Sequence, residues 1–159
     1  MPRSSPVLAT AIDNPCAIIR ALGVLSDTWT FLVVREAFLG ASTFARFREA
    51  LGISTDVLTV RLAALVEHGV LVRTPYREPG RRVREAYHLT PAGQELVTVL
   101  AALQQWGHDH VGDGAALRVA PVTDDDRQPV RAHLVDPAGR EVPPQDVRFE
   151  LVEGSPTVA

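Results

Sequence analysis

Arginines and small hydroxylated side chains are concentrated in the middle of the chain, between residues 42 and 90. This stretch holds eight arginines and five acidic residues, a local charge of +3, although the whole chain carries −3. A DNA duplex presents dense negative charge, and arginine donates paired hydrogen bonds to phosphate and to guanine. The distribution of charge therefore indicates double-stranded DNA as a partner.

Several of these arginines surround a predicted turn. The sequence Glu-Pro-Gly at residues 78–80 favours a reversal between two β-prone segments, residues 70–77 and 83–89. Side chains at the tip of such a ribbon can reach the DNA backbone or the minor groove. The alternative is a charged turn that only faces solvent. The arginines on or beside this turn are Arg77, Arg81, Arg82 and Arg84.

A helix predicted over residues 55–68 precedes this ribbon and is of a size that fits the major groove. Ser54 caps its start, and Leu58, Leu62 and Leu65 recur on the face that we expect to be buried. The outer face and its flank carry the residues that we expect to meet DNA, which are Thr55, Asp56, Thr59, Val60 and Arg61.

The residue types on this outer face suggest different roles. Thr59 can hydrogen-bond to a base or a phosphate, and Val60 can contact a thymine methyl group. Asp56 either caps the helix or accepts a hydrogen bond from cytosine N4. We expect Arg61 to bind a phosphate. The alternative for the whole segment is an ordinary packed helix with a bland outer face.

A shorter helix predicted over residues 43–51 completes a helix-turn-helix motif. Ser42 and Thr43 stand at its start, where hydroxyl and backbone N–H groups either bind a phosphate or simply cap the helix. Arg46 either adds a phosphate contact or lies on an exposed face. These three residues complete the predicted DNA-binding set.

The rest of the chain divides by composition into an arm, further helices and a tail. Residues 1–13 are rich in Pro, Ser and Ala and predict a flexible arm. Residues 14–112 hold the predicted winged helix-turn-helix domain, with helices starting near Asn14, Ser26 and Thr90.

The tail, residues 113–159, holds nine acids and five arginines. Alternation of apolar and polar residues at 117–122, 130–135 and 147–152 predicts a small three-stranded β unit or a set of hairpins. The predicted fold is thus mainly α with small β: a winged helix-turn-helix with added N- and C-terminal helices and a small C-terminal β-hairpin unit.

The composition argues against several other classes of protein. One cysteine, Cys16, allows neither an intrachain disulfide nor a Cys-based zinc site within one chain. His108 and His110 could bind a metal, but we interpret them as a solvated helix end. No phosphate loop, nucleophile elbow or paired-carboxylate motif is present, so we expect no enzyme and no cofactor. No apolar run is long enough to span a membrane, and we expect a cytoplasmic protein.

Four ordered blocks within residues 14–112 resemble the HxlR-type winged-helix regulators. The first runs from Cys16 to Ala37 and includes Asp-Thr-Trp-Thr and Arg-Glu. The second comprises Phe-Ala-Arg-Phe-Arg-Glu-Ala-Leu-Gly-Ile-Ser at 44–54 and Val-Leu-Thr-Val-Arg-Leu at 57–62. The third is Glu-His-Gly-Val-Leu-Val, and the fourth is Tyr-His-Leu-Thr-Pro-Ala-Gly, followed by a helix ending in Trp-Gly.

The resemblance implies a bacterial transcription factor that binds specific DNA sequences as a homodimer. The first and last helices of the domain would form the dimer interface, and two-fold symmetry implies a pseudo-palindromic operator. A repressor is the expected role. The family often has polar residues where Asp56 and Val60 stand, so its base preference does not carry over.

The resemblance also draws attention to Cys16. Some family members sense oxidants through a cysteine in this region, and the start of a helix favours a reactive thiol. The alternative is a small packing residue. Two other functions remain open: a sensor of an unknown small-molecule effector on a winged-helix scaffold, and a protein-interaction module that uses the β-prone tail.

Overall fold

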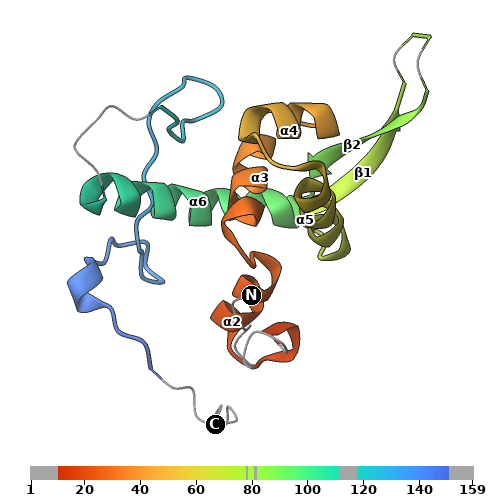
Figure 1. Ribbon diagram of the computed structural model, residues 1–159. Helices are drawn as coiled ribbons and strands as arrows, with labels where there is room; N and C mark the ends of the chain where they lie inside the picture. Colours follow the sequence, from red (N-terminus) through yellow and green to blue (C-terminus); the bar gives the residue numbers. More distant parts are fainter. Residues whose placement is uncertain (1–10, 78, 81, 112–117, 151–159) are drawn as a thin grey trace. The chain divides into compact units, whose positions relative to one another are not determined.

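The computed structural model describes residues 11–77, 79–80, 82–111 and 118–150. The chain divides into two compact units, Met1–Gln94 and Glu95–Ala159. Figure 1 shows the elements in chain order: η1 (Ala11–Asp13), α2 (Ala17–Val24), α3 (Thr28–Phe38), α4 (Phe44–Leu51), α5 (Thr55–Glu67), β1 (Leu71–Tyr76), β2 (Arg84–Leu89), α6 (Pro91–His110) and η2 (Pro144–Asp146).

The core of the first unit lies between α3, α4, α5 and the ribbon, which contact one another. Each helix has an apolar stripe at helical spacing, and burial of these stripes removes large apolar side chains from water. The side chains with less than 2% exposure include Val33, Val34, Phe47, Leu58, Leu62, Leu65 and Leu71. The prediction that Leu58, Leu62 and Leu65 of the helix at residues 55–68, here α5, face the core is thereby confirmed.

Capping residues fix the turn between α4 and α5. Thr43 Oγ1 accepts a hydrogen bond from the Arg46 N–H at 3.4 Å and starts α4. Gly52 ends α4 with φ 60°, a left-handed conformation that glycine adopts at little cost. Ser54 Oγ then accepts from the Val57 N–H at 3.4 Å and starts α5. The predicted helix-turn-helix is therefore present.

The two strands form an antiparallel ribbon in which Leu71 pairs with Leu89 and Tyr76 with Arg84. The strands begin and end within one residue of the predicted limits. The segment before α4 joins this ribbon, because the Tyr87 N–H donates to the Ser42 carbonyl oxygen at 2.7 Å. Backbone pairing therefore holds the start of α4 against β2.

A second junction connects the end of α5 to the start of α6. The Thr90 hydroxyl donates to the Gly69 carbonyl oxygen at 2.5 Å and accepts from the Gly93 N–H at 3.0 Å. A Cβ atom added at Gly93 would lie 2.1 Å from the Val70 carbonyl oxygen. This close approach requires glycine at position 93.

The N-terminal segment differs slightly from the sequence prediction. Residues 1–10 of the predicted arm lie outside the described residues, and Ala11–Asp13 form a short 3-10 turn. The Cys16 N–H donates to Asn14 Oδ1 at 2.9 Å, so the helix expected from Asn14 begins at Ala17 instead. A side-chain acceptor here competes with regular helix formation.

In the second unit, the tail contains hairpins, one of the two predicted alternatives. Among residues 118–150, antiparallel β-bridges join Val122 to Pro129 and Val135 to Glu141, and neither bridge extends into a regular strand. Residues 117 and 151–152 of the predicted β segments lie outside the described residues. Within this unit, Gln104 Nε2 of α6 donates to the Val119 carbonyl oxygen at 2.5 Å.

Candidate nucleic-acid interface

The outer face of α5 is open to solvent, as the sequence predicted. Thr55, Asp56, Thr59 and Val60 are all exposed, and the Val60 side chain is bulky and apolar with 55% exposure. An exposed valine on a helix of this width suits contact with a thymine methyl group. The threonine side chains of this face are small and uncharged, and Asp56 carries a negative charge.

Local hydrogen bonds limit what two of these side chains can do. The Thr59 hydroxyl donates to the Thr55 carbonyl oxygen at 2.8 Å, so it remains available mainly as an acceptor, for instance from a base amino group. Ser54, rather than Asp56, supplies the cap of α5. Asp56 lies in the first turn, where a negative charge is favoured by the helix dipole.

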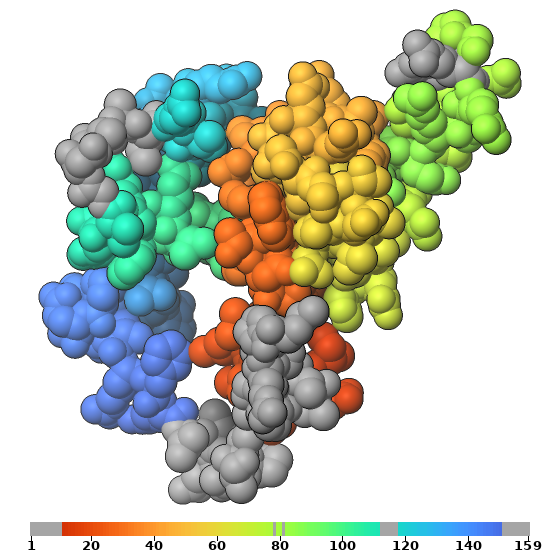
Figure 2. Space-filling view, in the orientation of Figure 1, coloured from red at the N-terminus to blue at the C-terminus, as the bar shows by residue number. Residues whose placement is uncertain are grey.

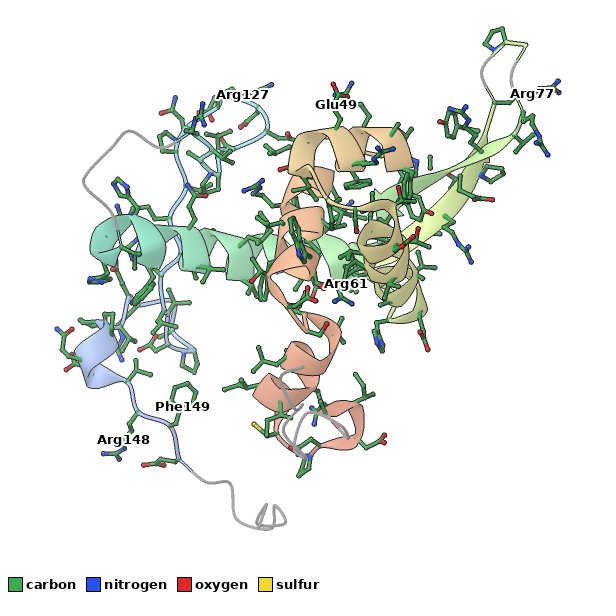
Figure 3. All side chains as sticks on the ribbon, viewed as in Figure 1. Glu49, Arg61, Arg77, Arg127, Arg148 and Phe149 are labelled. Carbon is green, nitrogen blue, oxygen red and sulfur yellow. The ribbon has the colours of Figure 1, made fainter. Side chains whose placement is uncertain are left out.

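The structure places Arg61 away from this outer face. Its Nη2 forms an ion pair with Asp27 Oδ2, and the side chain is only 27% exposed. Figure 3 shows Arg61 beside the N-terminal end of α3. The sequence does not predict this pair, because no local spacing connects two residues that lie 34 positions apart.

The residues before and within α4 have mixed positions. The Ser42 carbonyl oxygen and the Thr43 hydroxyl are used within the fold, as described above, and both residues are partly buried. Arg46 and Arg48 are exposed on α4. The structure thus makes the side chains of the two arginines available at the surface, while Ser42 and Thr43 have clear structural roles.

The ribbon carries exposed arginines beyond the helices. Arg77, Arg82 and Arg84 are exposed, and Figure 3 shows Arg77 near the far end of the ribbon. Figure 2 shows this ribbon standing out from α4 and α5. The fourth predicted arginine, Arg81, lies outside the described residues. The outer face of α5, Arg46 on α4 and this ribbon combine exposure with the predicted residue types.

Among the described residues, no three His, Cys, Asp or Glu side chains gather to hold a metal ion. No single described helix is long and apolar enough to cross a membrane, and α2 and α3, which together reach that length and hydropathy, bend by 78° at their break. Cys16 is an exposed free thiol immediately before α2.

Solved structures with related folds are mostly transcription factors. The chain is similar to PA1607, a candidate transcription factor, with 33% identity, coverage of 89% of this chain and 98% of that chain, and a TM-score of 0.77. It is also similar to PA1374 of Pseudomonas aeruginosa, another candidate transcription factor, with 32% identity, coverage of 89% and 95%, and a TM-score of 0.61.

Related sequences bear similar descriptions. The uncharacterised HTH-type transcriptional regulator Rv3095 of Mycobacterium tuberculosis is 39% identical over 92 residues, which are 58% of this chain and 57% of that protein. The chain therefore matches little more than half the length of this relative. A regulator of Synechocystis, sll1512, is 39% identical over 95 residues, which are 59% of this chain and 69% of that protein.

A family model for the HxlR-like helix-turn-helix matches residues 24–114, which include α3 to α6 and the ribbon. The winged helix-turn-helix geometry, the related structures and this match agree, and they confirm the resemblance seen in the four sequence blocks. The chain belongs to the HxlR-like helix-turn-helix family.

Proposed function

We propose that this protein is a sequence-specific DNA-binding transcriptional regulator that represses by occupying a promoter. The outer face of α5 would enter the major groove, and the arginines of the ribbon would contact the DNA backbone or the minor groove. The observation that carries this proposal is the combination of an exposed, apolar-tipped α5 face with exposed Arg82 and Arg84 on the neighbouring ribbon. No catalytic role is proposed.

We also propose that the protein acts as a homodimer on a pseudo-palindromic operator. Both predicted dimerisation helices carry exposed apolar side chains. Contact with water does not stabilise a monomer through these side chains, whereas their burial would stabilise a dimer. These are Ile18 and Leu22 on α2, with 55% and 45% exposure, and Leu103 and Trp106 on α6, with 52% and 58% exposure. A C2 dimer would place two α5 helices one DNA turn apart.

The proposal is tested by sequencing genomic DNA fragments that the purified protein retains. Binding to a recovered fragment is then measured across salt concentrations, because each neutralised phosphate adds about 0.9 to the slope of log affinity against log salt. A recurrent, two-fold related sequence with a steep salt dependence is the expected result. Retention of random fragments, or of none, would contradict the proposal.

Two variants separate positioning contacts from base contacts. Arg82→Ala should weaken binding similarly on all sequences and lower the salt slope by about 0.9 for each bound subunit. Thr59→Ala should instead change affinity by roughly 1 kcal/mol at particular base pairs, since a hydrogen-bond acceptor is lost from the α5 face. Competition assays with a library of single-base operator variants would measure both. Equal losses on every sequence for both variants would refute this division.

A second candidate function is redox sensing by Cys16, favoured by the exposure of its thiol. Diamide oxidises two thiols to a disulfide and is itself reduced, so treatment would yield a covalent dimer through Cys16 of two subunits or a mixed disulfide with an added thiol. Nonreducing gels and DNA-binding assays before and after diamide test this idea. The Cys16→Ser variant is the control, and unchanged DNA affinity without a covalent product would exclude it.

A further inference from the structure

An ion pair connects α5 to the start of α3. Arg61 lies in the middle of α5, and its Nη2 contacts Asp27 Oδ2. Asp27 is the N-cap residue of α3 and follows the corner between α2 and α3. The contact therefore connects the helix that would read DNA to the turn between α2 and α3.

The carboxylate of Asp27 is held in one orientation. Its Oδ1 accepts from the Thr30 N–H at 2.9 Å and from the Thr30 hydroxyl at 3.1 Å, and Thr30 is 1% exposed. Because these two bonds fix Oδ1, Oδ2 is presented to Arg61 in a defined direction. A charge held in this way can fix the rotamer of its partner.

The guanidinium of Arg61 is partly withdrawn from solvent. Its Nε is buried and has no hydrogen-bond acceptor within the described residues, and the side chain is 27% exposed. Because Nη2 is held by Asp27 and most of the side chain is covered, Arg61 presents fewer accessible N–H groups to a DNA phosphate than a fully exposed arginine would.

We infer that Arg61 is a positioning residue that sets the orientation of α5 through Asp27, and that it is not a phosphate contact. The inference rests on the proposed DNA-binding function. It assigns specificity to a pair of residues that touch no base: the pair fixes α5 against α3, and a small displacement of α5 would misplace Thr59 and Val60 in the groove.

The test uses full-length protein, a recovered operator and nonspecific DNA of the same length. Asp27→Asn removes the charge of the pair but keeps an oxygen that can accept from Thr30. Arg61→Met keeps much of the buried stem and removes the guanidinium. Glu49→Gln, on the exposed face of α4, matches the charge change of Asp27→Asn, and Arg82→Met matches the change at Arg61.

The sign of the Asp27→Asn effect discriminates between the two roles. Loss of a negative charge should by itself strengthen DNA binding, as it should in Glu49→Gln. If the pair positions α5, Asp27→Asn instead weakens operator binding about tenfold, spares nonspecific binding, and adds no further loss in combination with Arg61→Met. Arg61→Met keeps the wild-type salt slope, whereas Arg82→Met lowers it by about 0.9 for each bound subunit.

Hydrogen exchange of the α5 amides provides a readout that needs no DNA. The inference predicts faster exchange along α5 in Asp27→Asn than in Glu49→Gln. A salt slope lowered by about 0.9 for each bound subunit in Arg61→Met, together with unchanged binding and exchange in Asp27→Asn, would overturn the inference and leave the proposed function standing. If the wild-type protein retains no DNA, the proposed function fails and the inference fails with it.

Discussion

Side-chain oxygens at helix starts determine where the elements of the first unit begin. Asp27, Thr43, Ser54 and Thr90 each accept a backbone N–H near the start of a helix. Such caps stabilise a helix by about 1 kcal/mol each and fix the residue at which it starts. Asp27 also contacts Arg61 of α5, and the Thr90 hydroxyl also donates to the Gly69 carbonyl oxygen after α5. These two residues therefore help to fix how neighbouring elements pack as well as where a helix starts.

At the residue scale, the turn after Asp136 makes a pH-dependent prediction. The Arg140 side chain donates to Asp136 Oδ2 at 2.8 Å, and the N–H groups of Ala138 and Arg140 donate to Oδ1 at 2.9 and 3.0 Å. The Arg140 side chain first, and these backbone bonds after it, hold the pKa of Asp136 below its usual value of 3.8. Since the folded pKa is lowered, the turn is fully stabilised above the usual pKa and loses this stabilisation as pH falls through the lower, folded value.

The amide NMR signals of Ala138 and Arg140 measure the loss of these hydrogen bonds to Asp136 as the pH falls. They should stay constant between neutral pH and the usual aspartate range, and should move only below it. In Asp136→Asn the same signals should show no such acid transition. A midpoint at or above the usual aspartate pKa would contradict the prediction.

At the element scale, two junctions hold the ribbon and helices of the first unit together. Ser42 joins the start of α4 to β2 through the Tyr87 N–H, and Thr90 joins the end of α5 to the start of α6. Both use backbone groups that neither a helix nor a ribbon would satisfy alone. The relative positions of α4, α5 and the ribbon therefore follow from a few polar contacts in addition to apolar packing.

Two glycines of α6 should respond in opposite ways to the same substitution. Gly93→Ala would place a methyl group against the Val70 carbonyl oxygen and should destabilise the protein by roughly 1–3 kcal/mol. Gly107 has open space around it, and Gly107→Ala should stabilise the helix by about 0.5–1 kcal/mol. Urea unfolding followed by circular dichroism would measure both. Similar effects of the two substitutions would show that the close approach at Gly93 does not exist.

The helices and ribbon of the first unit could be predicted from the sequence because their signals are local. Apolar spacing and caps such as Ser54 and Gly52 lie within one turn of the helix ends that they define. The ion pair of Arg61 with Asp27 could not be predicted, because it depends on how α5 packs on α3. In the tail, the sequence predicted the hairpins but not how far their strands extend, since alternating apolar residues form a regular strand only when a neighbouring strand pairs with them.

At the scale of the whole molecule, the sign of the charge changes along the sequence. The basic excess lies in residues 42–90, and the acidic excess lies after residue 113. DNA should therefore attract one part of the chain and repel the other, and the net charge of −3 hides this difference. The salt dependence of binding should reflect the number of arginine–phosphate contacts and not the net charge.

The proposed dimer makes a further prediction at this scale. Trp106→Glu should convert the dimer to a monomer and weaken operator binding at least tenfold, because a carboxylate would be buried in an apolar interface. Light scattering at micromolar concentration measures the mass. Val135→Glu changes an apolar residue of the tail with similar exposure, 63% against 58% for Trp106, and serves as the control. A wild-type protein that is already monomeric would contradict the prediction.

The close approach of Gly93 to the Val70 carbonyl group also has a consequence for protein engineering. Residues 90–93 and their partners Gly69 and Val70 fit together closely enough that a foreign sequence at 93 would disturb both sides. A chimera that exchanges the C-terminal half of one regulator for that of another should therefore be spliced after Gln94. Splicing there would keep the native start of α6 and coincide with the border between the two compact units.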